Sequence, residues 1–277
     1  MLKKLIKHEF KNTSKVMLAI YALVAVVTLL GTISFVLLKP YVESGIVSFL
    51  SRMSLVLYVL SIFALFIVTY VYMCIHFYKS MYSDQGYLTH TLPVSPLTTF
   101  HVKLGVSLCW LICSFLVMFV SLCLLLISVT HGEFFSIFTA ESLSTFNAEL
   151  AEIDMTAGKL FAFAIFSVIL SCISYLLMVF ASISIGQLFN QNKIGFSIVA
   201  GIAIYFVEQI AGTVLMFSLL IPSSSALLTE ESMYAEIDTA SSFWNSTMFS
   251  SSILSLLFCI VLYAVCNIIV RKHINLD

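Results

Sequence analysis

A stretch without any charged residue lies between Lys15 and Lys39, and it constrains the fold of this chain most strongly. It holds 23 residues, Val16 to Leu38, and as an α-helix it would be about 34 Å long. The hydrocarbon core of a bilayer is about 30 Å thick, so one such helix can cross it. The strands of a membrane barrel would instead be about ten alternating residues long. We therefore predict a membrane-spanning helix over residues 16–38.

Five further apolar stretches satisfy the same length criterion. They cover residues 53–75, 104–130, 160–189, 194–221 and 248–270. The composition agrees, because 61% of residues are apolar, 10% are charged and the mean hydropathy is +1.08, whereas a soluble domain has about a quarter charged residues. The sequence has no internal repeat. We predict an all-α membrane fold, a six-transmembrane-helix bundle that forms a single transmembrane domain over residues 1–277.

Positive charges are divided unequally between the two sides of the predicted bundle. Of the 13 Lys and Arg residues, Lys39, Arg52 and Lys159 lie on one side, and the other ten lie on the opposite side with both termini. Most acidic residues show the reverse preference. Because cytoplasmic loops retain Lys and Arg, both termini are predicted to be cytoplasmic.

Residue patterns of common catalytic and cofactor sites are missing from the sequence. The seven cysteines all lie in apolar stretches, so neither a disulfide framework nor a metal site is predicted. A P-loop needs Gly-Lys followed by Ser or Thr, but Gly158-Lys159 is followed by Leu160. We expect the chain to be no enzyme and to hold no cofactor of its own.

The first 15 residues have the pattern of an amphipathic helix. One helical face carries Leu2, Leu5, Ile6 and Phe10, and the rest of the surface carries the basic residues Lys3, Lys4, Lys7, His8 and Lys11. A basic amphipathic helix is typical of segments that lie on an anionic membrane surface. We predict an interfacial helix over residues 2–15, and a role as a topology signal alone is the alternative.

The connection between the second and third predicted spans, residues 76–104, carries the most specific signals. Ser83 is suited to cap a short helix, and Gly86 would let another backbone approach closely. A second helix is predicted to start near Ser95, with Pro96 at its first position. A structureless loop is the alternative.

The string YSDQGYLTHTLPVS, Tyr82 to Ser95, follows the second of six spans in a chain with a basic amphipathic start. In this it resembles the permease subunits of ABC-2 type ABC transporters from Gram-positive bacteria. In those proteins this loop carries the coupling helix that docks on the ATPase. The resemblance implies that the ATPase-coupling residues are Asp84, Gln85, Gly86, Tyr87, Leu88 and Thr89.

The resemblance also implies partners and a location. ATP and Mg²⁺ would be bound by separate ABC ATPase subunits, and a second permease copy or a related permease chain would complete the pathway. The location would be a bacterial plasma membrane, with membrane lipids and no nucleic acid among the partners. The expected function is ATP-driven export of an amphipathic or hydrophobic substrate such as a peptide, drug or lipid-like molecule.

One ionisable residue, Glu208, lies near the middle of the fifth span. A charge there is costly unless it is shielded, paired or protonated. Tyr205 and Gly212 share its helical face, which predicts a polar position with close helix approach. A structural carboxyl, a pathway residue and a proton relay stay open, and the relay makes a proton-coupled secondary transporter the alternative function. The candidate substrate-pathway residues, of which Tyr58 and Tyr72 belong to a polar stripe on span two, are Glu208, Tyr205, Gln209, Tyr58 and Tyr72.

Overall fold

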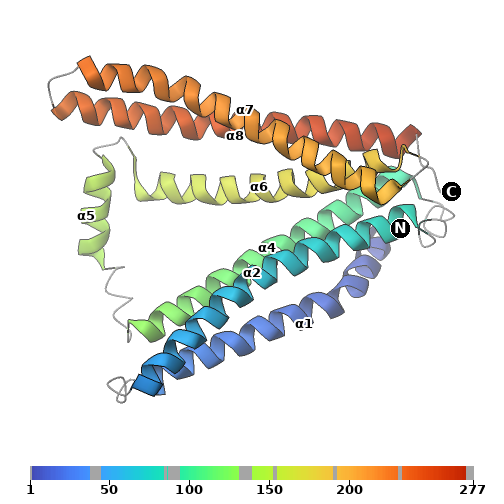
Figure 1. The fold of residues 1–277 in the computed structure, drawn as a ribbon, viewed down its shortest axis with the longest axis horizontal. Coiled ribbons are helices and arrows are strands. Elements are labelled where there is room, and N and C mark those ends of the chain that lie inside the picture. The colour runs from blue at the N-terminus through green and yellow to red at the C-terminus, as the bar shows by residue number, and fades with distance from the viewer. Residues whose placement is uncertain are drawn as a thin grey trace. The chain divides into compact units, whose positions relative to one another are not determined.

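The structure, a computed structural model, describes residues 2–37, 45–83, 86, 94–130, 139–151, 155–189, 192–229 and 233–272. All regular elements in these residues are α-helices: α1 (Leu2–Leu37), α2 (Gly45–Tyr82), α4 (Pro96–Val129), α5 (Ala140–Ala151), α6 (Ala157–Gly186), α7 (Lys193–Thr229) and α8 (Met233–Lys272) (Figure 1). Six of them, all except α5, are long and apolar enough to cross a membrane. This confirms the all-α fold with six candidate spans and indicates a multi-pass membrane protein.

The helices group into two compact units. Unit 1 consists of residues 1–79 and 93–142, and unit 2 consists of residues 80–92 and 143–277. Unit 1 therefore contains α1, most of α2 and α4, and unit 2 contains α6, α7, α8 and most of α5. The last turn of α2, from Ser80, groups with unit 2. The assignment of all residues to one domain stays a prediction.

Unit 1 is held together by apolar packing of α1 and α2 against α4. Its core is formed by Met17, Met73, Val102, Val106 and Trp110. The apolar side chains at the start of α1, including Leu5, Ile6 and Phe10, pack against this core. The face that the sequence assigned to a membrane surface thus contacts protein, because α4 offers it an apolar surface of matching length.

The predicted interfacial segment forms one continuous helix with the first span. Figure 1 shows that α1 bends in its N-terminal part. The Thr13 hydroxyl donates to the Glu9 carbonyl at 3.0 Å, and the Ser14 hydroxyl donates to the Lys11 carbonyl at 3.0 Å. Hydroxyls that bond to the carbonyl of the preceding turn often bend helices, so these two bonds account for a bend without a break.

The start of α4 agrees with the sequence prediction. Ser95 is the N-cap residue, and its hydroxyl accepts a hydrogen bond from the Thr98 N–H at 3.3 Å. Pro96 occupies the first helical position, where a missing N–H costs nothing. The third predicted span therefore begins eight residues earlier than its apolar stretch, at Pro96 instead of Leu104.

In unit 2, α6, α7 and α8 pack against one another. The very short link between the fourth and fifth apolar stretches, residues 190–193, predicts that these two spans are antiparallel neighbours. This is confirmed by a close approach of α6 and α7 at Gly186, where an added Cβ would overlap the Ser197 hydroxyl and lie 2.7 Å from the Lys193 carbonyl. Asn192, which precedes α7, has a φ of 51°. Asn tolerates this left-handed conformation better than most residues, which permits the tight turn.

Some helices begin or end at other residues than the apolar stretches in the sequence do. Residues 222–247 are acidic and hold no Lys or Arg, which predicts an external segment, but α7 continues past Ile221 to Thr229 and α8 begins at Met233. The length of an apolar stretch sets only the part of a helix that the hydrocarbon core can cover, and a helix can continue beyond it. In the segment after the third span, Phe146, Leu150 and Ile153 recur at helical spacing, which predicts a short amphipathic helix. The helix is confirmed as α5, in which Leu150 is buried and Phe146 is exposed, while Ile153 lies outside the described residues.

Candidate functional site

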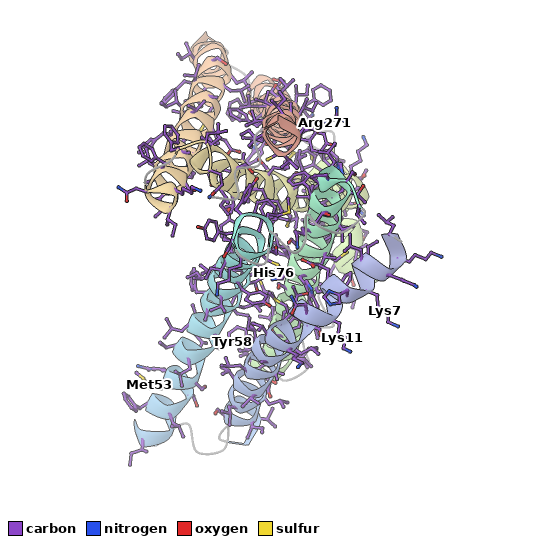
Figure 2. All side chains as sticks on the ribbon, turned by 90° about the vertical axis from the view of Figure 1, so that its right-hand side faces the viewer. Lys7, Lys11, Met53, Tyr58, His76 and Arg271 are labelled. Atoms are coloured by element: carbon purple, nitrogen blue, oxygen red, sulfur yellow. The ribbon has the colours of Figure 1, made fainter. Side chains whose placement is uncertain are left out.

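A buried carboxylate joins three helices at the end of unit 1 where α1 begins. Glu9 of α1 is 7% exposed, and its Oε1 accepts a hydrogen bond from Lys103 Nζ of α4 at 2.9 Å. His76 Nε2 of α2 lies 2.6 Å from the same oxygen. In Figure 2, His76 lies between α2 and α1. We call these three residues the Glu9 cluster.

Lys103 is as deeply buried as its partner, at 5% exposure. A buried ion pair is weak evidence for stability, but removing one partner leaves an uncompensated buried charge and costs several kcal/mol. His76 and Lys103 approach one oxygen of Glu9 from two different helices. This oxygen therefore specifies the positions of both α2 and α4 relative to α1. The cluster therefore acts as a charge clamp that fixes the register of three helices.

Aromatic and hydroxyl groups cover the next helical turn. The Trp110 indole N–H donates to the Thr13 hydroxyl at 2.8 Å, and that hydroxyl donates to the Glu9 carbonyl. Phe10 and Tyr21 pack against the Trp110 ring with centroid distances of 5.7 and 6.0 Å. This layer shields the Glu9 cluster from the apolar part of the unit and extends its hydrogen-bond network.

Further along the bundle, interhelical contacts are made by neutral hydroxyls. The Tyr21 hydroxyl donates to the Trp110 carbonyl at 2.9 Å and lies 3.0 Å from Ser114 Oγ. Thr69 Oγ1 of α2 lies 3.4 Å from Ser114 Oγ. Thr69 belongs to the polar stripe on span two. Its contact with Ser114 shows that this residue of the stripe packs against α4.

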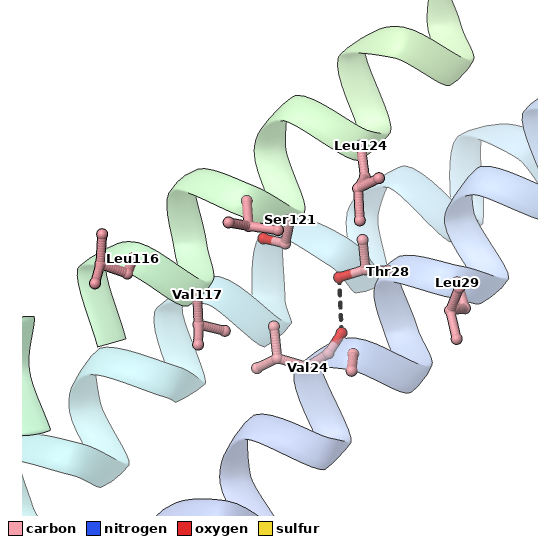
Figure 3. Close-up of a pocket in the computed structure, with 9 residues that line it drawn as sticks. Val24, Thr28, Leu29, Leu116, Val117, Ser121 and Leu124 are labelled. Atoms are coloured by element: carbon pink, nitrogen blue, oxygen red, sulfur yellow. Dashed lines mark hydrogen bonds between the residues drawn. The ribbon is translucent and has the colours of Figure 1, made fainter. Parts of the chain in front are cut away.

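An apolar groove of about 390 Å³ lies between α1 and α4 (Figure 3). Its two hydroxyls bond within their own helices: Thr28 donates to the Val24 carbonyl at 2.7 Å, and Ser121 donates to the Met118 carbonyl at 2.9 Å. Ser121 Oγ also lies 3.1 Å from the hydroxyl of Tyr58. Because these hydroxyls already have partners, the groove offers little to select a polar ligand.

Most residues of the predicted ATPase-coupling segment, namely Asp84, Gln85, Tyr87, Leu88 and Thr89, lie outside the described residues. Gly86 is described, and its N–H donates to the Ser83 carbonyl at 2.6 Å. An added Cβ would lie 2.6 Å from the Met81 carbonyl oxygen. The close neighbour of Gly86 is therefore the turn just before it in the chain, at Met81, and the approach of another segment at Gly86 stays a prediction.

The candidate pathway residues fall in both units. In unit 1, Tyr58 is buried, and Tyr72 is half-buried and stacks on His76 with a centroid distance of 5.9 Å. In unit 2, Glu208 is half-buried, and its Oε1 accepts a hydrogen bond from the Ser174 hydroxyl of α6 at 3.3 Å. The structure thus gives Glu208 a polar partner, as expected of an intramembrane carboxyl.

The neighbours of Glu208 on α7 are less enclosed. Tyr205 is 43% exposed and Gln209 is also exposed. The prediction of close helix approach at Gly212 is wrong, because no heavy atom lies within 4 Å of an added Cβ there. The approach occurs instead at Gly186 and Gly201, since the two helices are closest near their short connection.

The Glu9 cluster was not among the sequence-predicted site residues. Its signal was present: Glu9 is the one acidic residue in the first 15, and at helical spacing it falls beside Leu5 and Ile6 on the apolar face. An acid on that face needs a buried cation as partner. What the sequence could not supply was the partner, because Lys103 is 94 residues away.

Comparison with known protein families, characterised proteins and solved structures finds no match for this chain. Among the described residues, no three His, Cys, Asp or Glu side chains gather in a way that could hold a metal ion.

Proposed function

We propose that this chain is the membrane-spanning permease subunit of an ATP-driven ABC exporter, with both termini in the bacterial cytoplasm. The observation that carries the proposal is the Glu9 cluster. His76 and Lys103 lie at the two ends of the segment that resembles the coupling-helix loop, and both bind the carboxylate of Glu9. A loop that receives force from a partner needs flanking helices that move together.

The clamp supplies that mechanical link. When ATP closes the partner ATPase, the segment 84–89 moves with it, and α2 and α4 are displaced at their adjoining ends. Because both helices are bonded to α1 by one buried carboxylate, three spans move as a body instead of separating. Such rigid-body motion alternates access to a pathway between two packed arrangements.

A second contact carries the motion toward α6. The Tyr82 hydroxyl, in the last turn of α2, lies 2.8 Å from Ser184 Oγ of α6, and both residues are buried. This contact lies one residue before Ser83 and the segment 84–89. The end of α2 is therefore positioned to pass a displacement of that segment to a helix that packs against α7 and α8.

The proposal is tested by purifying the tagged chain with its ATPase partner and reconstituting the complex in vesicles. Replacing Tyr87 and Leu88 by Ala should abolish ATP-driven accumulation of a fluorescent amphipathic dye while ATP hydrolysis continues. As a matched control, Leu143→Ala with Phe146→Ala removes one aliphatic and one aromatic side chain, both exposed, from α5 and should leave transport unchanged. Failure of the chain to bind any ATPase contradicts the proposal.

The secondary-transporter alternative is favoured by one observation, the hydrogen bond from Ser174 of α6 to the carboxyl of Glu208 on α7. Its test is Glu208→Gln, which keeps an acceptor for Ser174 but cannot carry a proton. If the chain alone moves the dye in response to a proton gradient and Glu208→Gln abolishes this, the exporter proposal is wrong. ATP-driven transport that persists in Glu208→Gln supports it.

A further inference from the structure

A second groove lies between the N-terminal part of α1 and the start of α4. It holds about 310 Å³ and is lined by Leu2, Ile6 and Phe10 from α1 and by His101, Val102, Gly105, Val106 and Cys109 from α4. The α1 residues follow one another at intervals of four, and so do His101, Gly105 and Cys109. Each set therefore forms one helical ridge. The groove is the space between two ridges.

Gly105 keeps this groove open. No heavy atom lies within 4 Å of a Cβ added at Gly105, so a larger side chain would enter empty space there. From His101 to Cys109 the groove follows α4 for about 12 Å. It begins before the charge-free stretch that starts at Leu104 and ends within it. A ligand that fits would be apolar along its length and polar at one end.

Basic side chains lie beside the groove at that polar end. Lys3 and Lys7 are exposed, and they stand three residues before Ile6 and Phe10, on the adjoining strip of α1. Lys4 and Lys15 are also exposed but lie on the opposite side of the helix from Ile6. In Figure 2, Lys7 and Lys11 point outward from α1. The groove is thus bordered on one side by positive charge.

We infer that this groove binds one anionic phospholipid of the leaflet on the side where α1 begins. An acyl chain would lie along Gly105 and Cys109, and the phosphate would lie beside Lys3 and Lys7. Two observations select this occupant: the apolar lining continues into a membrane-spanning stretch, and the charge at its polar end is positive. The inference does not depend on the exporter function.

The test uses the intrinsic fluorescence of Trp110, whose ring packs 5.7 Å from that of Phe10. In a Trp244→Phe background, Trp110 is the one remaining tryptophan. The full chain is reconstituted in vesicles in which brominated phosphatidylglycerol or brominated phosphatidylcholine replaces part of the lipid. We expect phosphatidylglycerol to quench the fluorescence at a lower mole fraction than phosphatidylcholine does.

Two pairs of variants make the test specific. Lys3→Gln with Lys7→Gln should weaken phosphatidylglycerol association by about 30-fold at low salt, whereas Lys4→Gln with Lys15→Gln, which changes the net charge equally, should have little effect. Gly105→Leu should remove the quenching by filling the groove. Gly212→Leu, at another position with open space, should retain it.

Three results would overturn the inference. They are equal quenching by the two lipids in the unsubstituted groove, equal effects of the two lysine pairs, and undiminished quenching in Gly105→Leu. The first or second would mean that the groove has no headgroup preference. The third would mean that the quenching lipid is not in the groove.

Discussion

Replacing Glu9 by Met should be among the most damaging single changes in unit 1. Lys103 would keep its ammonium group in a site where the residue is 5% exposed, without the carboxylate that now lies 2.9 Å away. Breaking a buried ion pair from one side costs about 3–5 kcal/mol. We expect a loss of stability in that range.

The reciprocal change, Lys103→Met, should cost less. Glu9 would still have His76, whose Nε2 lies 2.6 Å from its Oε1, so the carboxylate would keep a charge-assisted hydrogen bond. Loss of one hydrogen bond to a charged group costs about 1.5–3 kcal/mol. The double variant should be more stable than Glu9→Met alone, because two apolar side chains can replace a buried ion pair at little cost.

The measurement is the free energy of unfolding of the purified chain in mixed micelles, from titration with a denaturing detergent followed by Trp fluorescence. Lys11→Met, at an exposed position on the same helix, serves as the control and should change stability by less than about 0.5 kcal/mol. If the effects of the two single changes simply add in the double variant, the residues do not interact and the clamp is refuted.

Two further changes test unit 2. Gly186→Ala should lower the unfolding midpoint and cost about 1–3 kcal/mol, because the new Cβ would lie 2.7 Å from two backbone atoms of α7; Gly212→Ala, with open space around it, should be neutral or stabilising, and equal effects would contradict this packing. Tyr82→Phe should cost about 1 kcal/mol in the same assay through loss of its 2.8 Å contact with α6, and an unchanged midpoint would mean that this contact contributes nothing.

The sequence alone was sufficient for the architecture, since each span is specified by a local property, the length of an apolar stretch. It was also sufficient for the start of α4, because the Ser95 cap and Pro96 act on their own helix. Contacts between helices that are distant in the chain could not be predicted. The apolar face of α1 packs on α4, a contact that the sequence does not indicate, and the interfacial position of this helix stays a prediction.

The candidate site shows the same difference between local features, which the sequence predicts, and contacts between distant helices, which it does not. That Glu208 needs a polar partner follows from its position in an apolar stretch, but that Ser174 supplies it does not. Three Ser residues recur at helical spacing on span four, and only the packing of α6 on α7 selects one. For Gly212, the absence of a side chain permits a close approach but does not require one.

Three serines that make interhelical contacts share a property that the Glu9 cluster lacks. Ser114, Ser121 and Ser184 each also donate to a carbonyl one turn earlier in their own helix. When neighbouring helices separate or slide, these serines keep an intrahelical bond and leave no unpaired serine donor in lipid. Neither Glu9 nor Lys103 has such a substitute. Small displacements between α1, α2 and α4 are therefore inexpensive away from the Glu9 cluster and costly at the end where α1 begins, so that this end acts as a pivot.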